Sequence, residues 1–170
     1  MKEEKRYILT NLVSATPMTK SEFKAYLKGS SATIVNLSSV VRDLLGSDKF
    51  ADKEGYAVNI AGDIHWIPKK SFESMTIELV DNKTLPSGIN VGKEMVDDMI
   101  QSHDTITLGN KTTVVRATLK NGFEMVESSG CVDEENYDTT IGEEICLRKI
   151  KKRIWEYLGF LLQTAWKGIY

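Results

Sequence analysis

Residues 119–159 read LKNGFEMVESSGCVDEENYDTTIGEEICLRKIKKRIWEYLG and predict a β-hairpin, a short connection and a long helix. Asn121-Gly122 is the strongest short hairpin signal, because both central positions of such a turn need positive φ. Thr140, followed by Glu143 three residues later, forms a capping box that predicts the start of the helix. Apolar residues then recur at helical spacing and predict its buried stripe: Ile141, Ile145, Ile150, Ile154, Leu158, Leu161 and Ala165.

The residues before this hairpin extend it into a larger unit. Residues 104–108 and 111–119 are rich in β-branched residues and flank the turn signal Gly109-Asn110. Residues 93–102 carry apolar side chains on one helical face and predict a helix. We therefore expect a helix, an antiparallel β-meander and a long C-terminal helix packed together over residues 90–170.

The N-terminal part predicts a second, smaller α+β unit. We expect a strand over residues 7–13, interrupted by Pro17, and then a helix that is capped by Thr19 and Glu22 and ends at Gly29. A second helical face spans residues 33–46, and residues 55–66 read as a hairpin. Because residues 81–89 hold Pro86, Gly88 and small polar residues, they are the predicted linker between a domain at 1–80 and one at 90–170. The predicted fold class is α+β.

Composition excludes several kinds of protein. The formal net charge of 170 residues is −2, which gives no strong attraction to long nucleic acid or to a membrane. No apolar run reaches membrane-spanning length, and the first residues lack the apolar core of a signal peptide. Cys131 and Cys146, with His65 and His103 far upstream, match no zinc-ligand spacing. We expect a cytoplasmic protein with reduced thiols and no metal or cofactor.

The polar clusters admit a structural and a functional interpretation. The basic run over residues 148–153 follows an acidic stretch and is typical of a solvated helix face opposite Ile150 and Ile154. The alternative is a surface that binds a small phosphorylated ligand, since arginine donates a planar fork of hydrogen bonds to phosphate. Arg116 is expected on the outer face of its strand, either solvated or in contact with a ligand.

The remaining candidates are better explained by structure than by chemistry. The carboxylates of Asp133, Glu134, Glu135 and Asp138 lack the spacing of a calcium loop and suit a turn beside a helix N-terminus. Both cysteines are expected to be buried, and His65-Trp66 to be a packed pair. Trp155, Trp166 and Tyr170 are expected in the core or in a subunit interface. No catalytic signature is present, so the chain is predicted not to be an enzyme.

Residues 90–162 resemble a small-protein family of tailed phages known as gene product forty-nine or sixty-six. The resemblance rests on a hairpin Leu-x-Asn-Gly-Phe, a Cys-Val-Asp, a polar turn ending in Asn-Tyr-Asp, an Ile-Gly, and a helix closing with Trp-x-x-x-Gly-Phe-Leu-Leu. In this chain these residues are Leu119, Asn121, Gly122, Phe123, Cys131, Val132, Asp133, Asn136, Tyr137, Asp138, Ile141, Gly142, Trp155, Gly159, Phe160, Leu161 and Leu162. The chain departs from the pattern at Glu134, where the family commonly has proline.

Residues 8–73 resemble a small phage β-domain. The matching residues are Ala15, Pro17, Met18, Thr19, Glu22, Phe23, Gly55, Tyr56, Val58, Gly62, Trp66, Pro68, Lys69, Phe72 and Glu73. This domain often precedes a module of the second Thoeris anti-defence type, which sequesters a nucleotide immune signal. The C-terminal block is similar in its expected make-up to the first Thoeris anti-defence family.

These resemblances imply a phage protein in the cytoplasm of an infected bacterium that binds a nucleotide signal without cleaving it. The implied ligand is of the cyclic ADP-ribose or cyclic oligonucleotide type. Donors for its phosphates and a platform for its base would come from Arg116, Lys120, Phe123, Asn136, Tyr137, Arg148, Lys152 and Arg153. The alternative is a phage interaction protein that binds a host or phage protein through its aromatic helix end. Because that helix carries apolar residues on more than one face, we also expect a homo-oligomer formed through it.

Overall fold

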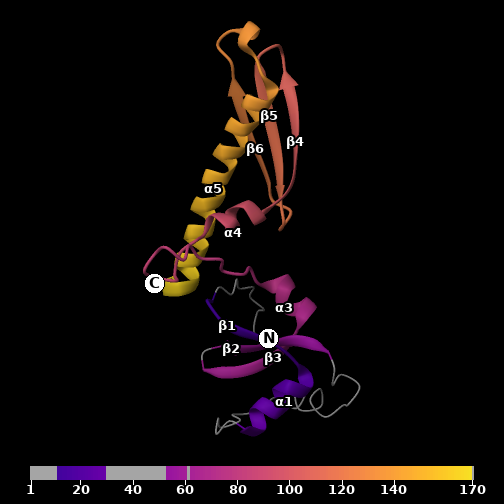
Figure 1. The fold of residues 1–170 in the computed structure, drawn as a ribbon, viewed down its shortest axis with the longest axis vertical. Coiled ribbons are helices and arrows are strands. Elements are labelled where there is room, and N and C mark those ends of the chain that lie inside the picture. The colour runs from indigo at the N-terminus through magenta and orange to yellow at the C-terminus, as the bar shows by residue number, and fades with distance from the viewer. Residues whose placement is uncertain (1–10, 30–52, 61, 170) are drawn as a thin grey trace, which may run out of the picture. The chain divides into compact units, whose positions relative to one another are not determined.

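The computed structural model describes residues 11–29, 53–60 and 62–169, and divides into two compact units between Ile77 and Glu78 (Figure 1). Each unit contains a three-stranded antiparallel sheet in which the strands follow one another in chain order. The predicted α+β class is therefore confirmed. No helix in the described ranges is long and apolar enough to cross a membrane.

The N-terminal unit consists of β1 (Ser14–Thr19), α1 (Lys20–Gly29), β2 (Glu54–Ile60), β3 (Asp63–Pro68) and α3 (Lys69–Met75). The predicted capping box is present: the Thr19 N–H donates to Glu22 Oε2 at 2.7 Å, and the Glu22 N–H donates to Thr19 Oγ1 at 3.2 Å. The predicted hairpin over residues 55–66 is also confirmed, as β2 and β3.

Two predictions for this unit are wrong. The strand expected over residues 7–13 begins instead at Ser14 and runs through Pro17, because β1 is an edge strand, where proline is tolerated. His65 is exposed rather than packed, since it points away from the half-buried Trp66, whose indole N–H donates to the Met18 carbonyl at 3.3 Å. Residues 7–10 of that predicted strand and the helix expected over 33–46 lie outside the described residues.

The C-terminal unit confirms the predicted meander. Its elements are α4 (Lys93–Asp98), β4 (Ile100–Leu108), β5 (Thr112–Leu119), β6 (Glu124–Gly130), the short 3-10 helix η2 (Glu134–Asn136) and α5 (Thr139–Lys167). Gly109 and Gly122 occupy the two turns with φ of 67° and 81°, a conformation that glycine adopts without strain. The helix predicted over 93–102 ends at Asp98, because Ile100 pairs with Leu119 and starts β4.

The helix α5 packs along one face of this sheet (Figure 1). Every second residue of β5 faces it, so Thr113, Val115, Ala117 and Leu119 are buried while Arg116 points to the opposite face. The α5 residues in this core are Gly142, Cys146, Ile150, Ile154 and Leu158.

The predicted start and stripe of this helix are wrong in their first turns. Asp138, and not Thr140, is the N-cap, because its side chain accepts hydrogen bonds from the N–H groups of Thr140 and Ile141. The stripe therefore opens with Gly142 and Cys146, and Ile141 is exposed. Leu161, also predicted in the stripe, is exposed as well, because the sheet does not cover that side of the helix end. Cys131 is also only partly buried, and its thiol donates to the Asp133 carbonyl at 2.9 Å, whereas the prediction of a buried Cys146 is confirmed.

Candidate functional site

The eight residues predicted to bind a ligand are spread over the C-terminal unit. Asn136 and Tyr137 precede the start of α5, whereas Phe123 follows the β5–β6 turn and contacts Tyr157 in an edge-to-face pair with ring centroids 6.3 Å apart. The 18 helical steps from Thr139, where α5 begins, to Tyr157 rise about 27 Å at about 1.5 Å per residue. The predicted set therefore does not form one binding site.

Three of the predicted phosphate donors are already paired with carboxylates. Arg116 bridges the two outer strands, with Asp104 at 2.7 Å and Glu124 at 3.8 Å. Lys120 Nζ lies 2.6 Å from Asp98 Oδ1. These exposed pairs contribute little stability, but each one reduces the positive charge available to a phosphate.

Arg153 is the third of these donors, and it contacts Tyr157, the aromatic partner of Phe123. Its guanidinium donates to Glu127 Oε1 at 2.9 Å and to the Tyr157 hydroxyl at 3.0 Å. The hydrogen bond to Glu127 raises the pKa of Arg153 above its ordinary value. The junction of hairpin and helix therefore does contain an aromatic pair and an arginine, but the arginine is held by β6.

Tyr137 locks the start of α5 onto the sheet. Its hydroxyl oxygen lies 2.8 Å from Thr107 Oγ1, 3.0 Å from Thr113 Oγ1 and 3.3 Å from Thr139 Oγ1. These hydrogen bonds, that with Thr107 first, lower the pKa of Tyr137. Asn136 lies beside it and donates its backbone N–H to the Asp133 carbonyl. Both residues have structural contacts at this end of the sheet.

In the basic run of α5, some residues contact neighbouring elements and others point into solvent. Lys149 donates to the Ser128 carbonyl at 2.7 Å, and Lys151 Nζ lies 2.8 Å from Asp97 Oδ1, so these two bind to neighbouring elements. Arg148 and Lys152 are exposed on the side away from the sheet. The prediction that all five charges lie opposite the core is therefore correct only for Arg148 and Lys152.

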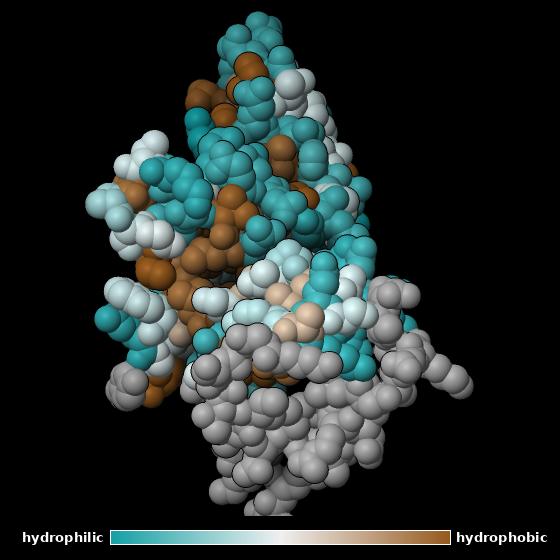
Figure 2. All heavy atoms as spheres, turned by 60° about the horizontal axis from the view of Figure 1, so that its bottom comes forward, coloured by the Kyte–Doolittle hydropathy of each residue, from teal (hydrophilic) through white to brown (hydrophobic). Residues whose placement is uncertain are grey.

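The second half of α5 is exposed and apolar. Six large side chains over its last four turns and the residues that follow keep more than a third of their surface accessible: Trp155 (45%), Tyr157 (44%), Phe160 (75%), Leu161 (38%), Trp166 (49%) and Ile169 (86%). Hydrophobic residues gather into a brown patch on the left side of the view in Figure 2. We name residues 155–169 the apolar half of α5. Trp155 and Trp166 are thus not core residues. The alternative expectation, that they lie in a subunit interface, stays a prediction.

A surface pocket of about 200 Å³ opens on the apolar half of α5. Its α5 residues are Trp155, Gly159, Leu162, Gln163 and Trp166, and its other wall is formed by Ile89, Asn90 and Val91. Sequence reasoning missed Gly159 and Gln163 as site residues. Together with Trp155 and Trp166 they lie at i, i+4, i+8 and i+11, which places all four residues near one helical face. This spacing is the feature of the sequence from which a shared site could have been predicted.

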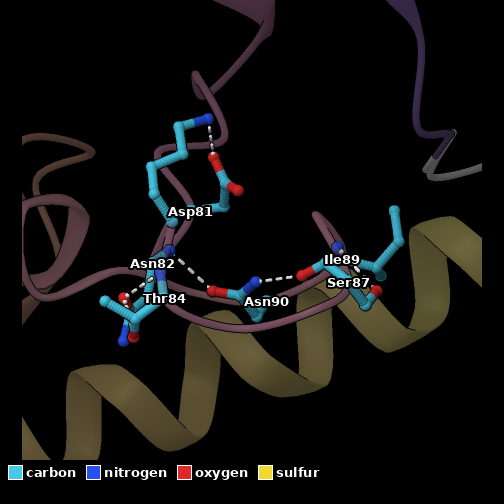
Figure 3. A network of polar contacts seen from close by, with 7 residues as sticks. Asp81, Asn82, Thr84, Ser87, Ile89 and Asn90 are labelled. Atoms are coloured by element: carbon cyan, nitrogen blue, oxygen red, sulfur yellow. Dashed lines mark hydrogen bonds and ion pairs between the residues drawn. The ribbon is translucent and has the colours of Figure 1, made fainter.

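The wall opposite α5 is ordered by polar contacts, although these residues were expected to form a linker (Figure 3). The Asn90 side chain accepts from the Asn82 N–H at 2.7 Å and donates to the Ser87 carbonyl. Asn82 in turn accepts from the N–H and the hydroxyl of Thr84 at 3.0 and 2.8 Å. These bonds fix the segment beside α5, so the pocket has a defined wall.

Gly159 forms part of the pocket because it has no side chain. A Cβ atom added there would meet nothing within 4 Å, whereas one added to Gly142 would clash with the Oγ1 of Thr113. Gly142 is therefore required by packing within the chain. Gly159 costs the helix about 1 kcal/mol relative to alanine without any such requirement among the described residues.

The described residues hold no group of three or more His, Cys, Asp or Glu side chains that could bind a metal ion. Three of the four carboxylates singled out in the sequence have structural contacts instead. Asp133 and Asp138 cap η2 and α5, and Glu134 accepts from the Asn110 side chain at 3.1 Å.

Comparison with known proteins gives one match, over the C-terminal unit. Residues 91–166 match the model of the Phage protein (N4 Gp49/phage Sf6 gene 66) family. The matched range holds α4, the three strands of the meander and all but the last residue of α5. No curated protein and no solved structure matches the chain. The relation to the Thoeris anti-defence proteins stays a prediction.

Proposed function

We propose that this phage protein acts by binding rather than by catalysis, and that the apolar half of α5 is its contact surface for a phage or host protein. One observation carries the proposal: five large apolar side chains of α5, and Ile169 just after it, are exposed next to an open pocket. Exposed apolar residues are common singly, but a contiguous group of this kind is typical of a protein–protein interface. Aromatic residues such as Trp155 and Trp166 are also the residue types most enriched among interface hot spots.

The arrangement of the polar residues supports the same proposal, because it is unfavourable for a charged ligand. The predicted ligand-binding residues are spread over the C-terminal unit, and Arg116, Lys120 and Arg153 already pair with carboxylates. A charged ligand would have to displace these partners. A protein surface that buries the tryptophans and Phe160 needs no such rearrangement.

The proposal is tested by affinity purification from infected cells, with proteins identified by mass spectrometry. We expect the wild-type chain to recover a defined protein and the variant Phe160→Lys to lose it. The matched control is Leu108→Lys, which places the same charge at a side chain that is 64% exposed on β4. Recovery that is equal for both variants would contradict the proposed surface.

Sequestration of a nucleotide signal in the infected cell is the second candidate. Arg148, Lys152 and Trp155 are exposed at i, i+4 and i+7 of α5, so two cations and an indole share one helix face. Such a face can hold phosphates beside a stacked base. This candidate also needs no catalytic residue.

Isothermal titration with glycocyclic ADP-ribose and with cyclic di- and trinucleotides tests this candidate. It predicts micromolar or tighter binding that is lost in Lys152→Glu, and ligand that is released intact when the protein is denatured. Absence of binding at micromolar concentrations would exclude sequestration of these ligands, and cleaved ligand would indicate an enzyme.

A further inference from the structure

We infer that the pocket on the apolar half of α5 and two exposed cations before it form one continuous site, which binds an acidic peptide segment of the partner protein. The segment places one large apolar side chain in the pocket and its carboxylates beside Arg148 and Lys152. This inference rests on the proposed function and names the chemistry of the partner. It is carried by the size of the pocket, by the glycine that keeps it open, and by the cations in line with it.

The pocket has the size of a single large side chain. Its volume of about 200 Å³ is below the range of about 300–1,000 Å³ that is usual for sites that enclose a whole small molecule. Trp155, Leu162 and Trp166 line it, so an apolar side chain gains most from entering it. The anchor residues of protein interfaces fill pockets of this kind.

Gly159 keeps the pocket open. It lines the pocket, and a Cβ atom added to it would meet nothing within 4 Å, so a larger side chain there would take up space in the hollow. Gln163 adds a polar group to the same lining. Its exposed side-chain amide has no hydrogen-bond partner in the described ranges, and it can both donate to and accept from the backbone of a peptide.

Two cations of the basic run lie in line with the pocket. Arg148 and Lys152 are exposed, and Trp155 and Gly159 follow them at steps of three and four residues, so all four lie on one helical face. Within the part of the chain that the structure describes, neither cation forms an ion pair, whereas the other three basic residues of the run bond to neighbouring elements. The charges of Arg148 and Lys152 are therefore available to the carboxylates of a partner.

The carboxylates around these cations leave the surface positively charged. Glu144 and Glu156 lie one turn beyond the two cations, at either end, and form no ion pair with them. The single carboxylate of Asp97 is shared by Lys93 and Lys151, at 2.8 Å from each. Residues 148–156 carry five basic side chains and one acidic side chain, although the formal net charge of the whole chain is −2. This local charge attracts an acidic partner.

The geometry of α5 also sets the spacing of the residues in the partner. Lys152 and Arg148 lie seven and eleven residues before Gly159, which is about 10.5 and 16.5 Å along the helix at about 1.5 Å per residue. An extended peptide advances about 3.3 Å per residue. A segment that runs along α5 therefore has acidic residues about three and five positions from its apolar anchor.

Selection from a random peptide library on the immobilised full chain tests the inference. We expect the enriched peptides to share one large apolar residue with Asp or Glu about three and five positions away. In fluorescence anisotropy, the dissociation constant of an enriched peptide should rise about tenfold or more in Gly159→Leu, which fills the hollow, and in Lys152→Glu. Gly159→Ala, with its smaller side chain, should have a smaller effect. Lys70→Glu on α3 is the matched control for charge and should bind as the wild type does.

Salt gives a second measurement, because higher ionic strength should weaken peptide binding to the wild type more than to Lys152→Glu. Enrichment of no peptide, enriched peptides without acidic residues, or wild-type affinity in Gly159→Leu would overturn the inference. Phe160 does not line the pocket, so it separates this inference from the proposed function. If Phe160→Lys loses a protein from infected cells that both Gly159→Leu and Lys152→Glu retain, the inference fails and the proposed function stands. If all three variants recover that protein as the wild type does, both fail.

Discussion

Gly142 and Gly159 lie in the same helix but have opposite surroundings. The hydrogen of Gly142 faces the fully buried Thr113, and a Cβ there would lie 2.6 Å from the Thr113 Cβ. Gly142→Ala should therefore overpack this contact and lower the free energy of unfolding by about 1–3 kcal/mol. Gly159→Ala should instead stabilise the fold by about 0.5–1 kcal/mol, because alanine favours the helix and meets no atom of the chain. Urea denaturation of both variants checks this prediction, and equal effects would contradict it.

Tyr137 should matter to stability more than its position in a loop suggests. Tyr137→Phe removes the hydroxyl that bonds to Thr107, Thr113 and Thr139, and it leaves the buried Thr113 hydroxyl without this partner. A buried hydroxyl that loses its hydrogen bond costs about 1–3 kcal/mol. Tyr157→Phe is the control, since its hydroxyl accepts one bond from Arg153 at the surface. We expect a clearly lower melting temperature for the first variant only, and a drop of equal size in both would contradict the assigned role.

A polar contact joins two elements, β4 and the first turns of α5. Glu143 accepts from Thr105 and lies 3.3 Å from His103 Nε2, and these bonds, that with Thr105 first, lower its pKa below the ordinary 4.5. A carboxylate whose pKa is lowered on folding adds stability above its unfolded pKa and loses it as the pH falls through the folded one. Glu143→Gln should therefore flatten the fall in melting temperature at pH values below about 4.5, while the exposed Glu144→Gln should not. Parallel curves for wild type and Glu143→Gln would contradict this.

The elements of the C-terminal unit could mostly be predicted from the sequence. Asn121-Gly122 and Gly109-Asn110 marked both turns, because only a few residues adopt their backbone angles. The first turns of α5 could not be predicted, because Asp138 and Thr140 are both good caps and glycine carries no hydrophobic signal for the core position of Gly142. Likewise, nothing in the local pattern distinguished the end of α4 at Asp98, which depends on the pairing of Ile100 with Leu119.

The candidate site could be predicted far less well, for a physical reason. Whether Arg153 is available to a ligand depends on Glu127, which is 26 residues away in the chain, and Lys120 pairs with Asp98 across 22 residues. Such pairs form only when the sheet and helix are assembled. The exposed aromatic end of α5 was visible in the sequence because too many apolar residues surround one helix, but the pocket also needs the distant segment around Asn90.

At the scale of the whole molecule, the two compact units should fold separately. A chain of residues 78–170 contains α4, the meander, α5 and the segment that forms the pocket wall. We expect it to unfold in one cooperative transition and to keep the binding behaviour of the full chain, because the apolar half of α5 and the wall of its pocket both lie within these residues. Circular dichroism and affinity purification with this fragment check the prediction. Failure to fold would show that residues 12–77 are needed and would contradict the division into domains.

The account as a whole rests on the claim that the apolar half of α5 is covered by a protein in the infected cell. A photo-crosslinking amino acid at position 160 tests this claim most directly, with the same group at position 108 on β4 as the control. We predict crosslinked product from position 160 only, at twice the chain mass if the partner is a second copy and at another mass if it is a different protein. The absence of any product from position 160, or equal products from both positions, would contradict the claim.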